Sequence, residues 1–207
     1  NNDKNVHGII VQRPLPQHID EGLIANSINP KKDVDGFHPN SKFSQPVGEA
    51  VLKILEKIYE RTISTRILLV SFAQGVSFTK WLKSKRITVV GAGITAGKPI
   101  IKTLQREGIE PQIVTSKTEN RAEILKNSDI VISAVGKPNT VKGEELKKGS
   151  VLIGVGMFKE EDGRFNSDYE EEDIKEMVSF YTPIPGGVGP VNVAMLLSNL
   201  LKSAENQ

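Results

Sequence analysis

The chain has 207 residues, of which 38% are hydrophobic and 25% charged, and its formal net charge is +2. These values are typical of a globular protein with one large domain or two small ones, so we expect no membrane partner and no nucleic-acid partner. Cysteine is absent, which excludes disulfides and thiolate metal sites and favours a reducing compartment such as the cytoplasm. The three histidines have no ligand spacing, so no metal is predicted.

The N-terminal part of the chain combines short elements with loops. Residues 7–11 form an apolar run that predicts a short buried strand, which the following prolines end. A weak helix is expected at 20–29 and a loop at 31–41, where charged residues and turn signals gather. Apolar residues recur at i, i+3 and i+4 spacing over 47–60 and predict a helix. Within 61–84, ILLVSF is compatible with a strand or a buried helix, and FTKWLKSK indicates a helix.

The region 85–183 alternates regularly between apolar strands and helices. Near-continuous apolar strands in such an alternation are typical of parallel strands covered on both faces. The predicted fold class is therefore α/β, with a Rossmann-like parallel-sheet dinucleotide domain. A further helix, at 191–204, carries an apolar stripe that we expect to pack in a core. The predicted strands are 86–90, 111–116, 129–135, 150–155 and 178–183, and the helices between them include 99–105 and 119–127.

The first motif that can carry chemistry is VVGAGITAGKP, which follows a strand and opens a helix. Its glycines, Gly91, Gly93 and Gly97, are spaced GxGxxxG rather than GxGxxG. Glycines let the backbone approach a pyrophosphate, which then lies at the positive end of the helix. The alternative is a tight strand-to-helix turn without a ligand, but the position in the alternation favours a dinucleotide site.

The end of the second predicted strand bears on the choice of dinucleotide. An acidic side chain there would accept a hydrogen bond from the ribose of NAD. The sequence reads VTSK instead, with Ser116 and Lys117 in place of an acid. Hydroxyl groups and a lysine suit a 2′-phosphate better, so this strand end favours NADP.

The second motif is KDVDGFHPN, which places Asp33 and Asp35 two residues apart in a turn. Such carboxylates usually cap backbone N–H groups within the turn itself. The functional alternative is a carboxylate that accepts paired N–H donors from a heterocycle. Both alternatives remain open from spacing alone.

The third motif is TPIPGGVGP, with three glycines and three prolines just past a predicted strand. Proline fixes the backbone and glycine removes side chains, so the segment forms a stiff loop that a ligand can approach closely. A purely structural crossover between domains is the alternative.

Together, the blocks GIIVQRPLP, KDVDGFHP, the GxGxxxGKP loop, AVGKP and PGGVGPVNVAML resemble the bifunctional methylenetetrahydrofolate dehydrogenase/cyclohydrolases, in the same order along nearly the whole chain. The resemblance implies an enzyme of one-carbon metabolism and purine biosynthesis that acts on tetrahydrofolate derivatives. NAD(P) takes hydride from 5,10-methylenetetrahydrofolate, and water then opens the methenyl product to 10-formyltetrahydrofolate. It also implies a homodimer.

The resemblance implies roles for particular residues. Asp35 matches an aspartate that binds the pterin. Gln12 matches a glutamine that positions a catalytic lysine and orients the reacting groups. Both are therefore predicted as catalytic, and Asp35 also as substrate-binding. The loop that lines the folate site is matched by Pro185, Gly186 and Gly187, and the cofactor site by Gly91, Ala92, Gly93, Gly97 and Ser116.

Several positions depart from the family pattern. Arg13 replaces the usual leucine beside the glutamine, and Asn192 replaces a threonine. In the dinucleotide loop Ala92 and Gly93 replace an arginine and a serine, and the loss of that arginine, a natural partner of a 2′-phosphate, leaves NAD open. The family's catalytic lysine has no match, because it lies upstream of the glutamine. We therefore expect a missing N-terminal segment, with Lys31 or Lys32 as the substitutes if there is none.

The predicted organisation has four parts. A partial folate domain spans 1–60, a linker or insertion 61–84, the dinucleotide domain 85–183, and a loop and helix that return to the folate domain 184–207.

Two other functions compete with the enzyme. A catalytically impaired dinucleotide- or folate-binding module would lack turnover because of the missing lysine, and an unrelated Rossmann oxidoreductase would leave PGGVGP and KDVDGF unexplained.

Overall fold

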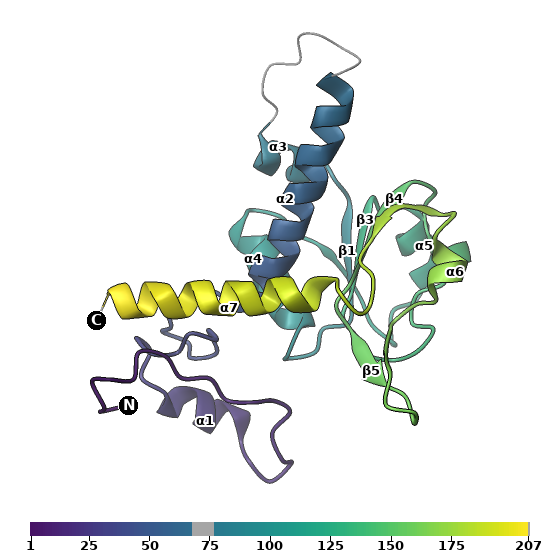
Figure 1. Cartoon of the computed structure of the whole chain (residues 1–207). Helices are drawn as coiled ribbons and strands as arrows, with labels where there is room; N and C mark the ends of the chain where they lie inside the picture. The colour runs from purple at the N-terminus through teal and green to yellow at the C-terminus, as the bar shows by residue number, and fades with distance from the viewer. Residues whose placement is uncertain (68–76, 207) are drawn as a thin grey trace.

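The computed structural model describes residues 1–67 and 77–206, and its main feature is a five-stranded parallel sheet (Figure 1). The strand order is β2-β1-β3-β4-β7, so the chain runs outward from β1 first to one side and then to the other. This reversal creates a topological switch point at the carboxyl ends of β1 and β3, where α/β sheets bind ligands. The strands are β1 (Ile87–Val90), β2 (Gln112–Val114), β3 (Ile130–Ser133), β4 (Ser150–Gly154) and β7 (Val178–Tyr181).

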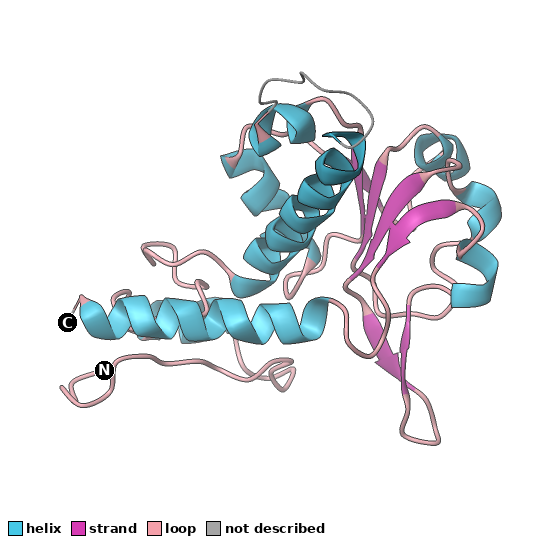
Figure 2. Cartoon of the chain, turned by 45° about the horizontal axis from the view of Figure 1, so that its top comes forward, coloured by secondary structure: helices cyan, strands magenta, loops and turns pink. Residues whose placement is uncertain are grey.

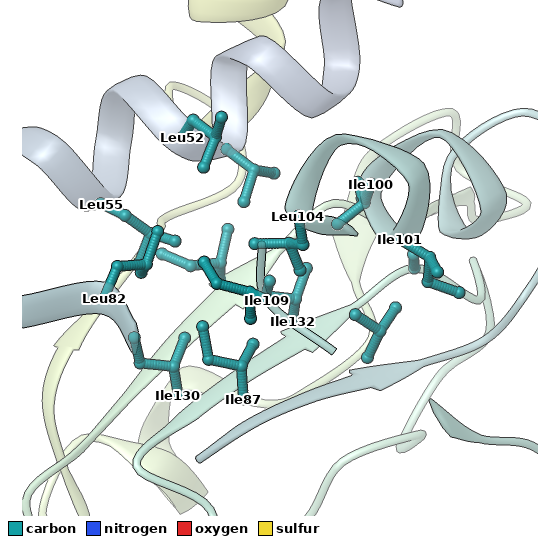
Figure 3. Packing of buried hydrophobic residues seen from close by; sticks show 14 of the residues in the cluster. Leu52, Leu55, Leu82, Ile87, Ile100, Ile101, Leu104, Ile109, Ile130 and Ile132 are labelled. Atoms are coloured by element: carbon teal, nitrogen blue, oxygen red, sulfur yellow. The ribbon is translucent and has the colours of Figure 1, made fainter. Parts of the chain in front are cut away.

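Helices cover both faces of this sheet, as the near-continuous apolar strands predict. On one face, α2 (Pro46–Ile67), α3 (Phe78–Lys83) and α4 (Gly97–Arg106) contribute leucines and isoleucines to one buried cluster with Ile87, Val89 and Ile132 (Figure 3). A side chain on Gly48 would overlap Thr103, so this glycine permits the close approach of α2 to α4.

The opposite face has its own buried cluster, built on strand residues that alternate with those of the first. Val90, Val131 and Leu152 pack there with Leu125 and Ile174. These last two come from α5 (Arg121–Lys126) and α6 (Glu171–Ile174), and the short 3-10 helix η1 (Gly143–Glu145) lies close to α5. The predicted α/β fold class with a doubly covered parallel sheet is confirmed.

The C-terminal helix α7 (Val188–Glu205) leaves the sheet and runs beside the N-terminal segment (Figures 1 and 2). Two polar side chains of α7 hold that segment. Asn199 donates to the carbonyls of Val34 and Ser44, each at 2.9 Å, and Ser203 donates to the carbonyl of His7 at 2.5 Å. The segment itself contains one helix, α1 (Glu21–Ser27), whose N-cap Asp20 accepts from the Leu23 N–H.

The predicted strand at 7–11 is wrong. Only Ile9 makes a bridge, to Asp33, and Ile10 is 52% exposed. A strand needs a partner that stays extended over several residues, but the partner here turns at once, because the N–H groups of Lys32 and Asp33 both donate to the Asn29 carbonyl. The segment lies against α7 instead, where a side chain on Gly8 would overlap Leu200.

The other elements agree with the sequence to within a few residues, with three additions and one gap. The additions are η1, α6 and a small antiparallel pair formed by β5 (Met157–Lys159) and β6 (Phe165–Ser167). The helix predicted at 47–60 runs on to Ile67, so the proposed domain boundary at residue 60 falls inside α2. The ambiguous ILLVSF segment lies outside the described residues apart from Ile67, whereas FTKWLKSK forms α3. No helix in the described part of the chain is long and apolar enough to cross a membrane.

Candidate active site

The glycine loop between β1 and α4 lies at the switch point of the sheet. Gly91 has φ +94°, and a Cβ there would lie 2.7 Å from the Ala134 carbonyl oxygen. A Cβ on Gly97 would overlap the Gly91 carbonyl, so the two ends of the loop lie too close together for any side chain at position 97. Gly93 has open space around it, and Ala92 packs against the core. Two of the three glycines are thus required sterically, and the cradle that they form fits a pyrophosphate at the start of α4.

The end of β2 lies beside this loop, since Val90 pairs with Val114 and the Gly91 N–H donates to the Val114 carbonyl at 2.8 Å. The chain then turns at 115–118, where the Thr115 N–H donates to the Thr118 hydroxyl. Ser116 is exposed in this turn. The structure therefore brings Ser116 and the glycine loop to the same edge of the sheet, as the cofactor prediction requires.

A second loop at this edge, AVGKP at 134–138, is shaped by a carboxylate that the sequence did not single out. Asp168 is fully buried and accepts four hydrogen bonds. Its donors are the Ser133 hydroxyl and the backbone N–H groups of Val135, Gly136 and Lys137, at 2.5 to 3.0 Å. No sequence signal distinguishes Asp168 from the acidic residues at 170–173 that follow it, because only the fold buries this one carboxylate.

A cleft of about 250 Å³ lies between the N-terminal segment, the start of α2, the glycine loop and α7. It brings together Gln12 and Asp35, the two residues predicted as catalytic, although 22 residues separate them along the chain. Thr95 of the glycine loop lines the same cleft, so the N-terminal segment and the glycine loop share one cavity. The remaining lining residues are Ile10, Val11, Arg13, Phe37, Gln45, Pro46, Val47, Asn192 and Leu196.

The two aspartates of KDVDGFHPN have separate roles. Asp33 is fully buried, and its carboxylate accepts the His38 N–H at 2.7 Å, which is the turn-capping alternative. Asp35 faces the cleft, and no described residue donates a hydrogen bond to its carboxylate. Burial raises the pKa of Asp35 above its ordinary value, against the opposing effect of the Arg13 guanidinium. Asp35 is therefore available to a ligand with N–H donors.

Gln12 is exposed at the cleft, where its amide Nε2 donates to the Arg13 carbonyl at 3.3 Å. The side chain of the next residue, Arg13, is by contrast only 7% exposed. In the sequence, Arg13 and Asn192 stood out only as departures from the family pattern, and Thr95 was not singled out. The structure places all three on the wall of the cleft, a grouping that depends on the packing of α7 and not on spacing.

The PGGVGP loop connects β7 to α7. Gly186 has φ +102°, which favours glycine, and a Cβ on Gly187 would overlap the Pro183 carbonyl. Pro185 and Gly186 are exposed, and the Ile184–Pro185 peptide is cis, as is Arg13–Pro14. These residues do not line the cleft described above; the loop leads into α7, whose Asn192 does.

The two lysines considered as substitutes do not reach the cleft. The Lys32 side chain is buried and donates to the Asp3 carbonyl at 2.6 Å. Lys31 lines a separate hollow between α2 and α7. The cleft wall, as far as the described residues show it, contains no lysine.

Residues 1–67 and 77–206 contain no cluster of three or more histidines and carboxylates that could hold a metal ion.

The sheet order, the glycine cradle at the switch point and the adjoining cleft define the class, a dinucleotide-binding α/β protein. Comparisons with known proteins identify the family. The family model for the NAD(P)-binding domain of tetrahydrofolate dehydrogenase/cyclohydrolase matches residues 75–207, and the model for its catalytic domain matches residues 1–35. The chain therefore belongs to the tetrahydrofolate dehydrogenase/cyclohydrolase family, and the resemblance predicted from the motifs is confirmed.

Individual relatives agree with this assignment. The chain is 40% identical to the bifunctional protein FolD 4, chloroplastic, of Arabidopsis thaliana, an alignment that covers 99% of the chain and 56% of that protein. The crystal structure of the Campylobacter jejuni bifunctional enzyme FolD matches with a TM-score of 0.84 and 34% identity, over 100% of the chain and 70% of that structure. The Trypanosoma brucei enzyme, complexed with NADP cofactor and an inhibitor, matches with a TM-score of 0.77 and 32% identity, over 100% and 69%. The chain thus spans little more than half of the plant protein's length.

Proposed function

We propose that the chain serves the NAD(P)-dependent oxidation of 5,10-methylenetetrahydrofolate to 5,10-methenyltetrahydrofolate and the hydrolysis of that product to 10-formyltetrahydrofolate. The observation that carries the proposal is the shared cleft. It places Gln12 and Asp35 on the same cavity as Thr95 of the glycine loop. Hydride transfer requires the folate and the dinucleotide to meet, and a cleft built from both sides provides that meeting place.

On the folate side, the Asp35 carboxylate accepts the adjacent N–H donors of the pterin edge. Its lack of a protein donor and its partial burial support this role, because a charge-assisted pair of hydrogen bonds is strongest where water is excluded. Gln12 orients the reacting groups through its exposed amide. Pro185, Gly186 and Gly187 precede α7 outside the described cleft, and the open space at Gly186 lets a part of the substrate that extends beyond the cleft approach this loop.

On the cofactor side, Gly91 and Gly97 provide the cradle, and Ala92, Gly93 and Ser116 complete the predicted cofactor site. When bound, NAD(P) accepts the hydride from the substrate. The loop N–H groups and the N-terminus of α4 hold the pyrophosphate, and the Asp168-anchored loop at 134–138 borders the same edge. We favour NADP over NAD because β2 ends in hydroxyl groups without an acid, and because the Trypanosoma brucei relative is complexed with NADP.

The proposal also covers the oligomeric state, the cellular compartment and the division of the chain into domains. The family resemblance supports a homodimer, and the absence of cysteine supports the cytoplasm. We assign the folate side to 1–60 and to 184–207, the dinucleotide domain to 85–183, and 61–84 to a linker or insertion, although α2 continues across residue 60 to Ile67. The contacts from Asn199 and Ser203 to the N-terminal segment support the return of α7 to the folate side.

The proposal is tested with Asp35→Asn, which keeps the size of the side chain and removes its charge. We expect kcat/KM for 5,10-methylenetetrahydrofolate to fall at least ~100-fold, because the amide offers one acceptor oxygen and repels an N–H donor with its own NH₂ group. The dissociation constant for NADP should stay within about twofold, since the cradle is untouched. The matched control is Asp162→Asn, the same change at an exposed carboxylate paired with Arg164 on the β5–β6 turn.

Two outcomes would decide against parts of this proposal. Normal turnover by Asp35→Asn would remove Asp35 from the folate site. A wild-type chain that binds NADP and tetrahydrofolate without turnover would favour the binding module, which the absence of a lysine among the described cleft residues supports. Activity of the wild-type chain on a substrate unrelated to folate would favour another Rossmann oxidoreductase.

A further inference from the structure

The cleft contains a charged side chain to which the family pattern assigns no role. Arg13 lies directly after Gln12, at a position where enzymes of the tetrahydrofolate dehydrogenase/cyclohydrolase family usually have leucine. Its side chain is 7% exposed, and its Nη1 atom lies 3.9 Å from the Asp35 carboxylate. A guanidinium that replaces an apolar side chain beside the proposed substrate-binding carboxylate changes the electrostatics of the site.

Arg13 is held in place by contacts other than its ion pairs. Its guanidinium carbon lies 3.4 Å from the centre of the Phe37 ring, and Nη1 donates to the Val11 carbonyl at 3.2 Å. Both contacts are independent of the acidic residues. The position of the cation in the wall of the cleft therefore does not depend on Asp35 alone.

Two carboxylates share this cation, and neither binds it tightly. Glu21 Oε2 lies 3.8 Å from Arg13 Nε, close to the 3.9 Å between Arg13 and Asp35. Both Arg13 Nε and Glu21 Oε2 are buried without a hydrogen-bond partner. These separations are too long for hydrogen bonds, so Arg13 acts on Asp35 through its charge and leaves the carboxylate oxygens open.

Resting on the function proposed above, we infer that Arg13 is a positioning residue that keeps the Asp35 carboxylate ionised and open to the N–H donors of the substrate. The ionised carboxylate can accept one such hydrogen bond at each oxygen, whereas the protonated form presents an O–H donor at one of them. Burial favours the protonated form, and the neighbouring Asp33 adds to that effect, whereas the Arg13 charge opposes it. The other cleft side chains near Asp35 are neutral: Gln12, Phe37, Gln45, Thr95 and Asn192.

The inference predicts opposite effects from two substitutions. Arg13→Leu removes the cation and should raise the pKa of Asp35. Glu21→Gln removes the competing carboxylate and should lower it, while Arg13→Lys should leave it close to the wild-type value. The control is Lys57→Gln, which removes an exposed cation paired with Glu60 on α2 and should change nothing.

The pKa is measured by carbon-13 NMR of the Asp35 carboxyl, assigned with Asp35→Asn, and needs no folate. Tetrahydrofolate binding is then measured at pH 5 and pH 8. Arg13→Leu should weaken binding at least ~3-fold more at pH 5 than at pH 8, because more of its Asp35 is protonated at the lower pH.

An Asp35 pKa that is unchanged or lower in Arg13→Leu, or higher in Glu21→Gln, would overturn the inference. An equal loss of affinity at both pH values would also overturn it, since a purely structural role acts at every pH. If Arg13→Leu does not fold, Glu21→Gln still decides by the direction of its shift, and Arg13→Lys should show none. A wild-type chain that binds no tetrahydrofolate at either pH would refute the proposed function. The order of the Asp35 pKa values that NMR gives for the variants would still decide the inference.

Discussion

The two sides of the cleft are built by different physical means. The sheet side has a continuous apolar core, in which strand residues such as Val89, Ile132 and Leu152 are fully buried. On the N-terminal side, hydrogen bonds from Asn199 and Ser203 of α7 to backbone carbonyls hold the segment beside the helix. Large apolar side chains remain exposed there, among them Ile10 at 52% and Leu201 at 61%. Apolar burial stabilises the sheet side of the cleft, whereas directional polar contacts help to position its N-terminal side.

This difference affects how each side should respond to substitution. A packed core resists local change until a side chain no longer fits, and then the cost is large. A segment held by a few hydrogen bonds loses its position when one donor is removed, while the rest of the protein stays folded. Three predictions follow this contrast, in order of decreasing effect.

The largest effect is expected from Gly97→Val at the glycine loop. Its side chain would overlap the Gly91 carbonyl, so the loop and the start of α4 must shift. We expect a loss of about 3 kcal/mol in the free energy of unfolding and at least ~10-fold weaker NADP binding, measured by denaturant titration and calorimetry. Gly93→Ser is the stability control, because a side chain there points into open space. Equal stability of the two variants would refute the packing argument.

The second effect concerns alkaline pH and the other face of the sheet. Burial raises the pKa of Tyr169 to about 12, and its hydroxyl donates to the Thr182 carbonyl. The neutral form is therefore favoured in the folded state. Its contribution is complete below pH 10, the ordinary value, and is lost between pH 10 and about 12. The shift corresponds to about 2–3 kcal/mol of stability across that window.

Tyr169→Phe should flatten this alkaline decline in stability, measured by denaturant titration at pH 9, 10 and 11. The other two tyrosines, Tyr59 and Tyr181, are present in both proteins and serve as an internal control. A decline of the same steepness in wild type and variant would show that Tyr169 is not its source.

The smallest effect is expected from Asn199→Ala, which tests the N-terminal side. The change removes the donor from two carbonyls, of Val34 and Ser44, and should destabilise that side by about 2 kcal/mol. Hydrogen exchange should speed up over residues 7–44 and remain slow in β1 and β3. Asn206→Ala, near the end of α7, is the control, since its amide bonds only within the helix. Faster exchange in the sheet as well would show that the two sides unfold together.

The same contrast explains which parts of the fold the sequence could predict. The five strands of the sheet were found because each is mostly apolar, a local pattern typical of parallel strands, although β2 begins with Gln112 and β7 contains Ser179. The strand predicted at 7–11 was wrong because an apolar run only becomes a strand if an extended partner lies beside it, and its partner turns at Asn29–Asp33. The β5–β6 pair was missed because its three-residue strands are too short to show a period.

Sequence alone determined the dinucleotide loop, the α/β class and the family, because glycine spacing and specific motif blocks are properties of neighbouring residues. It also singled out Gln12 and Asp35 through the resemblance. Only the tertiary structure decided that both line one cleft with Thr95, that Asp33 caps a turn, and that Arg13 lies between Asp35 and Glu21. These relations depend on how α7 and the N-terminal segment pack across long stretches of chain, and no local pattern records distances between residues so far apart.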